Sequence, residues 1–275
     1  MDKIISDKDR CILIPYDFTD EANFAIDHAL LLIKTENLPI HILHVVKKKK
    51  EIEAAKEKLQ LLVDNIKKEK FLFNVNFVIA VRKGNIYKQI YKYGIENGAY
   101  LAVMGTHGIK NIRKAMKVVK KFVRIPFILV QDPVKNKEFK NILLTIDTDK
   151  SQRIKAQWVN YLDKLFKSKA YIISHDESET YKVRDLRNNL LFIQEFFMNQ
   201  NIDYEMKGVY SKKYFADEIY NYAAEINADI ILLMTHRYRF YIKELRKSEN
   251  LERYKQIPIM CVNKRTDILK LGGFG

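Results

Sequence analysis

Residues 12–17 read Ile-Leu-Ile-Pro-Tyr-Asp, and residues 142–147 read Ile-Leu-Leu-Thr-Ile-Asp, an offset of 130 positions (147 − 17). Two further apolar stretches recur in the same order. They are Asn97–Met104, which returns as Asn227–Met234, and Ile125–Val130, which returns as Ile257–Val262. Three landmarks in one order indicate a duplicated domain. We therefore divide the chain into residues 1–135 and residues 136–275, each about the size of an ordinary domain.

Each half alternates short apolar runs with longer amphipathic stretches. The first run is apolar without interruption, which is typical of a strand buried on both faces. The expected strands are Cys11–Tyr16, Ile40–Val46, Asn74–Val81, Leu101–Met104 and Phe127–Gln131, then Ile142–Ile146, Ala170–Ser174, Ile202–Val209, Ile230–Met234 and Ile259–Val262. Strands that alternate with helices predict an α/β fold, with two open five-stranded parallel-sheet (Rossmann-like) domains in tandem.

Helical spacing of apolar residues fills the segments between these strands. The expected helices are Asp20–Thr35, Glu51–Lys70, Ile86–Glu96 and Lys110–Lys121, then Lys150–Lys167, Tyr181–Asn199, Tyr214–Glu225 and Tyr241–Tyr254. In Tyr181–Asn199 the apolar stripe is Val183, Leu186, Leu190, Ile193 and Phe197. One face of this helix is therefore expected to be buried.

The last strand of each half is too apolar to remain in water. Neither Phe127–Val130 nor Ile259–Val262 contains a Pro or Lys that would protect an exposed sheet edge. We therefore expect the two domains to pack as a pseudo-dimer through these strands. The first domain alone is expected to self-associate, which light scattering would detect.

Composition narrows the classes of protein that fit. The chain is 47% hydrophobic and 30% charged, which is typical of globular proteins. We expect a cytoplasmic protein without a membrane partner, because no signal peptide or spanning apolar run is evident and Cys11 and Cys261 lie in apolar runs. The net charge of +15 raises the alternative of nucleic-acid binding. Basic residues are interleaved with acidic ones and no nucleic-acid motif is present, so we do not expect that partner.

Ligands of open parallel sheets bind beyond the carboxyl ends of the strands, where the strand order reverses. Asp17–Glu21 follows the first strand, and Thr19 is suited to cap the next helix. The fourth strand is followed by Gly105-Thr106-His107-Gly108. Glycines there let the backbone approach an anion. His107 has two interpretations, a ligand contact or a loop anchor that bonds the backbone, and we favour the anchor.

The first half resembles the universal stress protein family. The matching segments are Ile12–Asp20 (ILIPYDFTD), Ile42–Val46 (ILHVV), Gly98–Gly108 (GAYLAVMGTHG) and Ile125–Val130 (IPFILV). The second half resembles the family more weakly, so the chain reads as a tandem of two such domains. The resemblance implies an open five-stranded fold, in a family whose members either bind ATP or do not.

In the members that bind ATP, an aspartate at the tip of the first strand lies beside the nucleotide. The resemblance assigns this place to Asp17, with Pro15 next to it, and the backbone that holds adenine to Val45. The phosphates rest on a loop that reads Gly-x2-Gly-x9-Gly-Ser/Thr. Gly105 and Gly108 match its first half, and Met104 and His107 complete the candidate cofactor-binding set.

The second half of that loop is missing. Counting from Gly108 places Gly-Ser at Val118-Val119, whereas counting back from Pro126 places it near Arg113-Lys114. Neither pair supplies a glycine backbone or a hydroxyl. The second domain reads Met234-Thr235-His236-Arg237 and has neither glycine, as if one had been deleted after Met234. We therefore expect no ATP in the second domain.

Three functions are consistent with this pattern. The first is a non-enzymatic stress-response protein that acts by interaction or weak ligand sensing, without efficient ATP binding. The second is an adenine-nucleotide-binding, slowly ATP-hydrolysing first domain. The third is an enzyme of the wider fold group, which would need catalytic residues that the sequence does not show.

Candidate partners are an adenine nucleotide or another anion. Lysines after the second and fourth strands offer an alternative anion site in the first domain, although solvated surface lysines are the favoured interpretation. Neither metal-ligand spacing nor a hydrolase or P-loop motif occurs in the sequence.

Overall fold

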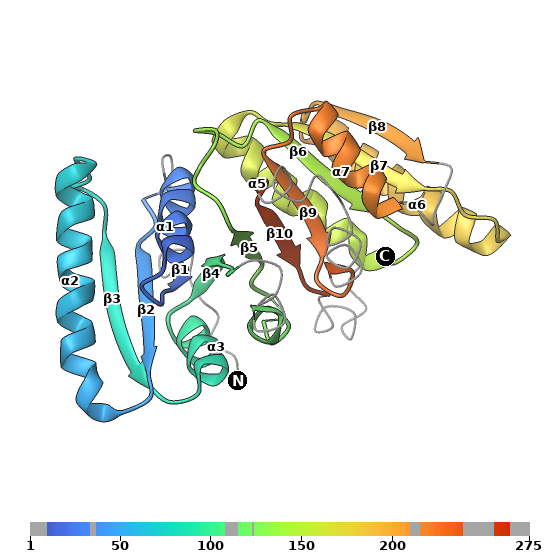
Figure 1. The fold of residues 1–275 in the computed structure, drawn as a ribbon. Coiled ribbons are helices and arrows are strands. Elements are labelled where there is room, and N and C mark those ends of the chain that lie inside the picture. The colour runs from blue at the N-terminus through green and yellow to red at the C-terminus, as the bar shows by residue number, and fades with distance from the viewer. Residues whose placement is uncertain are drawn as a thin grey trace. The chain divides into compact units, whose positions relative to one another are not determined.

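The computed structural model describes residues 10–33, 37–107, 115–122, 124–209, 215–238 and 256–264. The chain divides into two compact units, Met1–Pro133 (the first unit) and Val134–Gly275 (the second unit). Both alternate strands and helices along the chain (Figure 1).

The first unit contains a parallel sheet with the order β3-β2-β1-β4-β5. Its elements are β1 (Cys11–Pro15), α1 (Asp20–Leu32), β2 (Ile40–Val46), α2 (Ile52–Glu69), β3 (Phe77–Lys83), α3 (Ile86–Glu96), β4 (Ala99–Gly105) and β5 (Phe127–Val130). A 3-10 turn, η2 (Lys49–Glu51), precedes α2. Strand β1 is central and apolar, and Ile12, Leu13 and Ile14 are fully buried in it.

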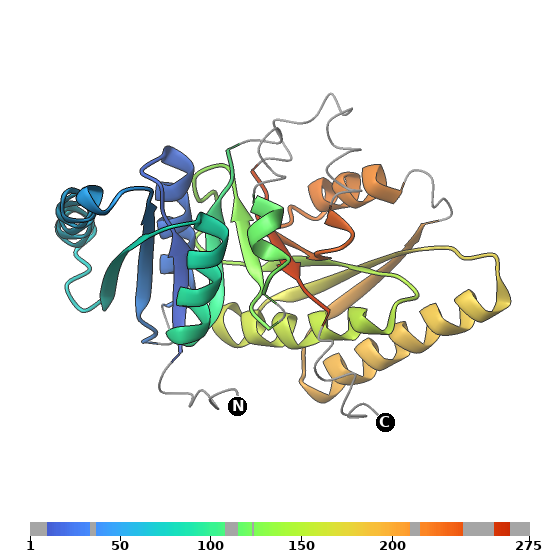
Figure 2. The ribbon, with the colours of Figure 1, turned by 90° about the horizontal axis from the view of Figure 1, so that it is seen from below.

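The second unit repeats this arrangement with the order β8-β7-β6-β9-β10, again parallel. Its elements are β6 (Asn141–Ile146), η3 (Lys150–Arg153), α5 (Ile154–Phe166), β7 (Lys169–His175), α6 (Thr180–Asn199), β8 (Tyr204–Val209), α7 (Phe215–Glu225), β9 (Ile230–Met234) and β10 (Ile259–Val262). Figure 2 shows α5 and α6 on one face of these strands and α7 on the other. The expected α/β fold with five parallel strands in each half is confirmed.

The reversal of strand order has the same place in both units. In the first unit it lies between β1 and β4, and in the second between β6 and β9. The carboxyl ends of these strands are therefore the places to look for a ligand. The packing of the two units as a pseudo-dimer through β5 and β10 stays a prediction.

Several expected boundaries differ from the structure. Strand β3 begins at Phe77 rather than Asn74, because a turn precedes it in which Val75 N donates to Leu72 O. Val183 of α6 is 45% exposed and does not belong to the buried stripe, whereas the polar Asn189 is buried there. Of the expected helix Lys110–Lys121, residues 115–119 are helical and 110–114 lie outside the described residues. The expected helix Tyr241–Tyr254 also lies outside them.

Cys11 and Cys261 are buried and unbridged, as expected. Burial raises the pKa of the Cys11 thiol to about 12, so this group is not a nucleophile near neutral pH. None of the helices in the described ranges combines the length and apolar character needed to cross a bilayer.

Candidate functional site

The tip of β1 carries a cluster formed by Asp17, Thr19, Glu21 and His107, named here the Asp17 cluster. His107 Nε2 lies 2.8 Å from Asp17 Oδ2, and His107 Nδ1 lies 3.3 Å from Glu21 Oε2. The Thr19 hydroxyl donates to Asp17 Oδ1 at 2.7 Å. The structure therefore brings together residues from both sides of the strand-order reversal.

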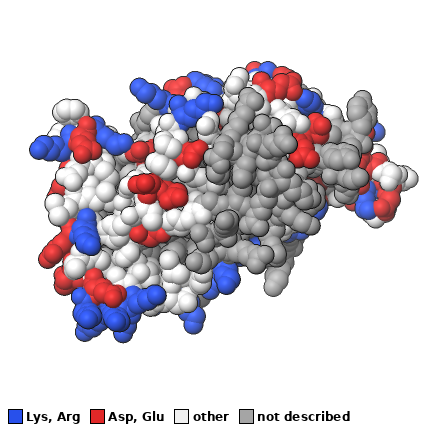
Figure 3. Space-filling view, viewed as in Figure 1, with Lys and Arg blue, Asp and Glu red and all other residues white. Residues whose placement is uncertain are grey.

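Helix α1 begins directly behind this cluster. Thr19 is its N-cap, as expected, and accepts a hydrogen bond from Ala22 N at 3.4 Å. Asp20 and Glu21 occupy the first turn, where negative charge is stabilised by the helix dipole. Acidic side chains gather around the place that α1 occupies in Figure 1 (Figure 3).

His107 is placed between two carboxylates and is 38% exposed. Partial burial lowers its pKa, but the Asp17 and Glu21 carboxylates raise it, and the net shift is upward. Both ring nitrogens face a carboxylate oxygen, which favours the doubly protonated imidazolium. His107 thus contacts acidic side chains, a role that neither sequence interpretation specified.

Gly105 ends β4 where the backbone of α1 comes closest. A Cβ atom at this position would lie 2.3 Å from Glu21 O and 2.7 Å from Ala22 N. Only glycine fits such an approach. Packing against α1 therefore explains Gly105 without any ligand.

Three other candidate residues, Pro15, Val45 and Met104, lie at or near the carboxyl ends of their strands. Pro15 ends β1 and pairs in register with Leu43, and Val45 on β2 pairs with Arg82. Met104 is buried beside Leu129 in the core. Gly108 lies outside the described residues.

An aromatic group formed by Tyr16, Phe18 and His44 stands at the tips of β1 and β2. The ring of Phe18 makes edge contacts with Tyr16 at 5.2 Å and with His44 at 4.8 Å between centroids. His44 Nδ1 lies 2.8 Å from Tyr16 O, which holds the two strand tips together. Phe18 adopts a left-handed backbone conformation, with φ of 64°, and its ring is partly exposed.

Where the family's loop would continue, the chain is buried instead. The side chains of Val118 and Val119 are 3% and 0% exposed. They belong to the core of the first unit, on a short helical segment. The other pair, Arg113-Lys114, lies outside the described residues.

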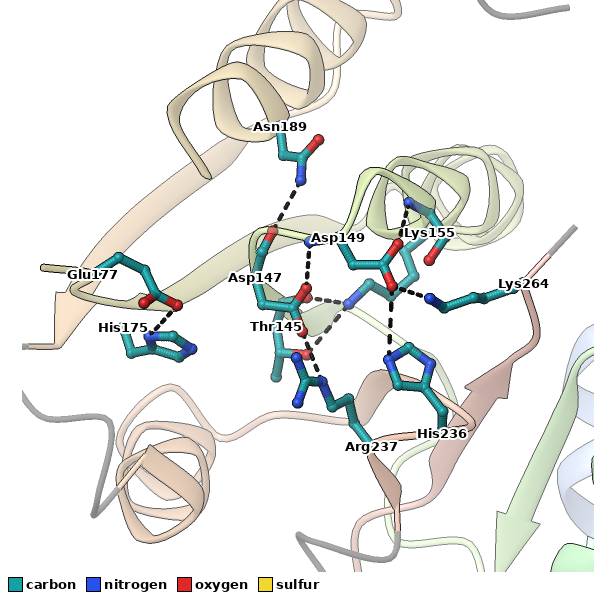
Figure 4. A network of polar contacts seen from close by, with 11 residues as sticks. Thr145, Asp147, Asp149, Lys155, His175, Glu177, Asn189, His236, Arg237 and Lys264 are labelled. Carbon is teal, nitrogen blue, oxygen red and sulfur yellow. Dashed lines mark hydrogen bonds and ion pairs between the residues drawn. The ribbon is translucent and has the colours of Figure 1, made fainter. Parts of the chain in front are cut away.

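The second unit has a different arrangement at the same edge (Figure 4). Arg237 Nε donates to Asp147 Oδ2 at 2.9 Å, and Asp149 N donates to Asp147 Oδ1 at 2.8 Å. Asp147 is 8% exposed, whereas Arg237 is 43% exposed. We refer to Asp147, Asp149, Lys155, His236, Arg237 and Lys264 as the Asp147 network.

Lys155 is the most deeply buried member of this network and has no exposed surface. Its ammonium group donates to Thr145 O and, at 3.3 Å, to Thr145 Oγ1. Burial lowers the pKa of Lys155 to about 7, against the attraction of Asp147. The group is therefore poised between its charged and neutral forms near neutral pH.

Asp149 forms the outer part of the network. It accepts from Ser151 N at 3.0 Å and from the Lys264 ammonium group, and His236 Nε2 lies 3.9 Å away. Burial and the charges of Lys264 and Arg237 lower the pKa of His236. The two equivalent histidines, His107 and His236, thus have pKa values shifted in opposite directions.

The residues that occupy equivalent places in the two units differ from those that the sequence alignment matches. Gly105 pairs with Val130 on β5, and Met234 pairs with Val262 on β10, so Met234 occupies the place of Gly105. The helices α3 and α7 end at Glu96 and Glu225, an offset of 129 (225 − 96). The one-residue difference therefore precedes these helices, and the inference that a glycine was deleted after Met234 is wrong.

Residues 10–122 match the model of the Universal stress protein family. The first unit therefore belongs to the universal stress protein family. The match ends before the second unit, whose likeness rests on its fold. No curated protein sequence matches the chain significantly.

Solved structures resemble the chain over nearly its whole length. A universal stress protein from Archaeoglobus fulgidus DSM 4304 is 17% identical, with a TM-score of 0.69 over 94% of this chain and 97% of that one. A functionally unknown protein from Pseudomonas aeruginosa PAO1 is 13% identical, with a TM-score of 0.64 over 97% and 98%. A putative universal stress protein from Pseudomonas aeruginosa UCBPP-PA14 is 13% identical, with a TM-score of 0.63 over 95% and 96%. At identities this low, the structural similarity shows a shared fold and nothing more.

Sequence reasoning missed three residues at the carboxyl edge of the second unit, namely Lys155, Asn189 and Lys264. Lys155 stands 130 positions after the buried Ala25, so a charged residue in an apolar place was a signal. Asn189, whose side chain donates to Asp147 O at 2.9 Å, and Lys264 carried no such signal. Within the described residues, no group of three His, Cys, Asp or Glu side chains is arranged to hold a metal ion.

Proposed function

We propose that this universal stress protein is a non-enzymatic stress-response protein that acts by interaction or weak ligand sensing, without efficient ATP binding. The burial of Val118 and Val119 carries the proposal. A phosphate loop needs backbone amides and a hydroxyl that reach the ligand, whereas these two valines face the core. The first unit therefore offers at most the first half of a phosphate cradle.

The state of Asp17 supports the same proposal. Its two oxygens already accept from Thr19 and face His107. A ligand hydroxyl that bonds this carboxylate must displace one of these partners, which reduces the net gain. The surrounding acidic groups Asp20 and Glu21 also repel phosphates.

The second unit is proposed to bind no ATP. Arg237 contacts the carboxylate that corresponds to Asp17, and Met234 fills the place of Gly105. The backbone there cannot approach a phosphate as it would at a glycine.

A location in the cytoplasm belongs to this proposal. It is supported by two buried thiols that form no disulfide, as in a reducing compartment.

An adenine-nucleotide-binding first unit is the alternative function. It is favoured by the exposure of Asp17 and by the partly exposed ring of Phe18, which contacts His44 near the end of β2. An aromatic ring at this place offers a surface on which a base can stack.

Thermal unfolding with added ATP and magnesium distinguishes the two functions. A ligand at 100 times its dissociation constant stabilises a protein by about 2.7 kcal/mol, which shifts the melting temperature visibly. We expect little or no shift at micromolar ATP. A large shift that Asp17→Ala removes and Asp147→Asn leaves unchanged would establish the alternative instead.

A further inference from the structure

The donors and acceptors of the Asp147 network do not balance. All four carboxylate oxygens are engaged: Asp147 accepts from Asp149 N and Arg237, and Asp149 accepts from Ser151 N and Lys264. Arg237 uses only its Nε atom in this network. Among the described residues, none accepts a hydrogen bond from its other two nitrogens. The network therefore has spare donors on Arg237, while each carboxylate oxygen already accepts from at least one donor.

Its charges are unequal in the same sense. Three basic side chains surround two carboxylates: Arg237 and Lys264 pair with them directly, and Lys155 is attracted by the charge of Asp147. Lys155 is fully buried, so its charge is poorly screened by water. An added negative charge would favour the protonated form of Lys155, whose pKa lies at about 7.

The donors are also accessible. Arg237 is 43% exposed and Lys264 is 42% exposed, whereas the carboxylate of Asp147 is covered. Arg237 comes from the turn after β9 and Lys264 from the segment after β10. Their side chains reach Asp147 and Asp149 at the carboxyl edge of the sheet (Figure 4).

We propose that the Asp147 network is a binding site for a small oxyanion, with the free end of the Arg237 guanidinium as the principal contact. The planar fork matches two oxygens of one phosphate or carboxylate group. Asp147 is a positioning residue, since it fixes the guanidinium through Nε and leaves the fork outward. Lys264 supplies a second positive charge, and Lys155 adds charge from below.

This site extends the weak ligand sensing of the proposed function to the second unit. It does not depend on the first unit, because it shares no residue with the Asp17 cluster. A failure to bind ATP in the first unit and a failure to bind an oxyanion in the second are therefore separate results.

The test is the dissociation constant of the full-length protein for inorganic phosphate, measured by calorimetry, with methyl phosphate, acetate and chloride at matched ionic strength. Saturable binding of phosphate, methyl phosphate or acetate is expected, and the tightest binder identifies a free phosphate, a phosphate ester or a carboxylate as the source. Arg237→Gln should weaken binding at least about tenfold, which corresponds to about 1.4 kcal/mol. Arg237→Lys, which keeps the charge but not the fork, should give an intermediate value.

Two controls separate binding from folding. Arg184→Gln removes an arginine of the same unit that is 72% exposed, and it should leave binding unchanged. Arg237→Gln leaves Asp147 without its cation, so Asp147→Asn/Arg237→Gln, which removes both charges, should restore stability without restoring binding. Equal binding by the wild type and Arg237→Gln, or a response to phosphate no greater than to chloride, overturns the proposal.

Discussion

The two units place the same fold around opposite chemistry. At the carboxyl edge of the first unit, one histidine faces two carboxylates, and Ala25 of α1 is an ordinary core residue. At the second edge three basic side chains surround two carboxylates, and Lys155 is buried at the position offset by 130 from Ala25. The comparison teaches that the same fold tolerates opposite charge environments at this edge of the sheet.

The packing of the helix that follows the first strand also differs between the two units. In the first unit α1 begins at Asp20 and its backbone requires a glycine at position 105. In the second unit a 3-10 turn, Lys150–Arg153, precedes α5, and the buried Met234 occupies the equivalent place. A change in the first turn of one helix therefore accompanies the replacement of a glycine by a large side chain on the facing strand.

Lys155→Met is expected to have the largest effect. The unfolded chain keeps a lysine proton up to about pH 10, whereas the folded protein releases it near pH 7. Unfolding therefore takes up a proton between these pH values, and this residue makes stability rise with pH by at most about 1.4 kcal/mol per unit. The variant should lose that contribution and gain about 1 to 4 kcal/mol at pH 7.

Urea unfolding from pH 6 to pH 10 measures this effect. Lys164→Met, an exposed lysine on the same helix, is the matched control and should change neither stability nor its slope. A wild-type slope that persists in Lys155→Met would show that Lys155 is charged throughout, and the contrast between the two edges would weaken.

Asp147→Asn and Asp17→Asn compare the two equivalent carboxylates. Asp147 is covered and holds Arg237, so its loss should cost about 1.5 to 3 kcal/mol. Asp17 is 45% exposed, and its loss should cost less than about 1 kcal/mol. The contribution of Asp147 should be present above the ordinary carboxyl pKa and disappear as the pH falls through its lowered pKa.

Chemical unfolding at pH 7 and pH 3 gives these differences directly. Burial raises the pKa of Asp147, but the Asp149 amide, Arg237 and Lys155 together lower it by more, so the net shift is downward. The stabilising effect of Asp147 therefore depends on its negative charge. Equal costs for the two variants at pH 7 would contradict the distinction between a buried and an exposed carboxylate.

Much of the fold was predictable because it depends on apolar periodicity. The strands Ile40–Val46, Ile230–Met234 and Ile259–Val262 and the helix Ile86–Glu96 have the expected ends. The candidate site was less predictable, since it depends on contacts between distant segments. The cap at Thr19 is local and was foreseen, whereas the pairing of His107 with Asp17 spans 90 positions. The register that places Met234 opposite Val262 likewise emerges only from strand pairing.

Gly105→Ala and Gly208→Ala test the packing difference with one matched pair. A Cβ at Gly105 would overlap the backbone of Glu21, so this variant should lose about 1 to 3 kcal/mol. A Cβ at Gly208 meets no atom within 4 Å, and replacing glycine within a strand should gain up to about 1 kcal/mol. Thermal unfolding of both variants checks the signs. An unchanged stability for Gly105→Ala would show that α1 can move away from β4.

The central claim is that the two carboxyl edges carry opposite charge environments, and their equivalent histidines report on it in one experiment. A proton and carbon NMR titration of the full chain, with signals assigned by His107→Gln and His236→Gln, gives both pKa values. His107, between Asp17 and Glu21, should titrate above the ordinary value of 6.5, and His236, near Lys264 and Arg237, below it. Equal pKa values, or a higher value for His236, would contradict the account.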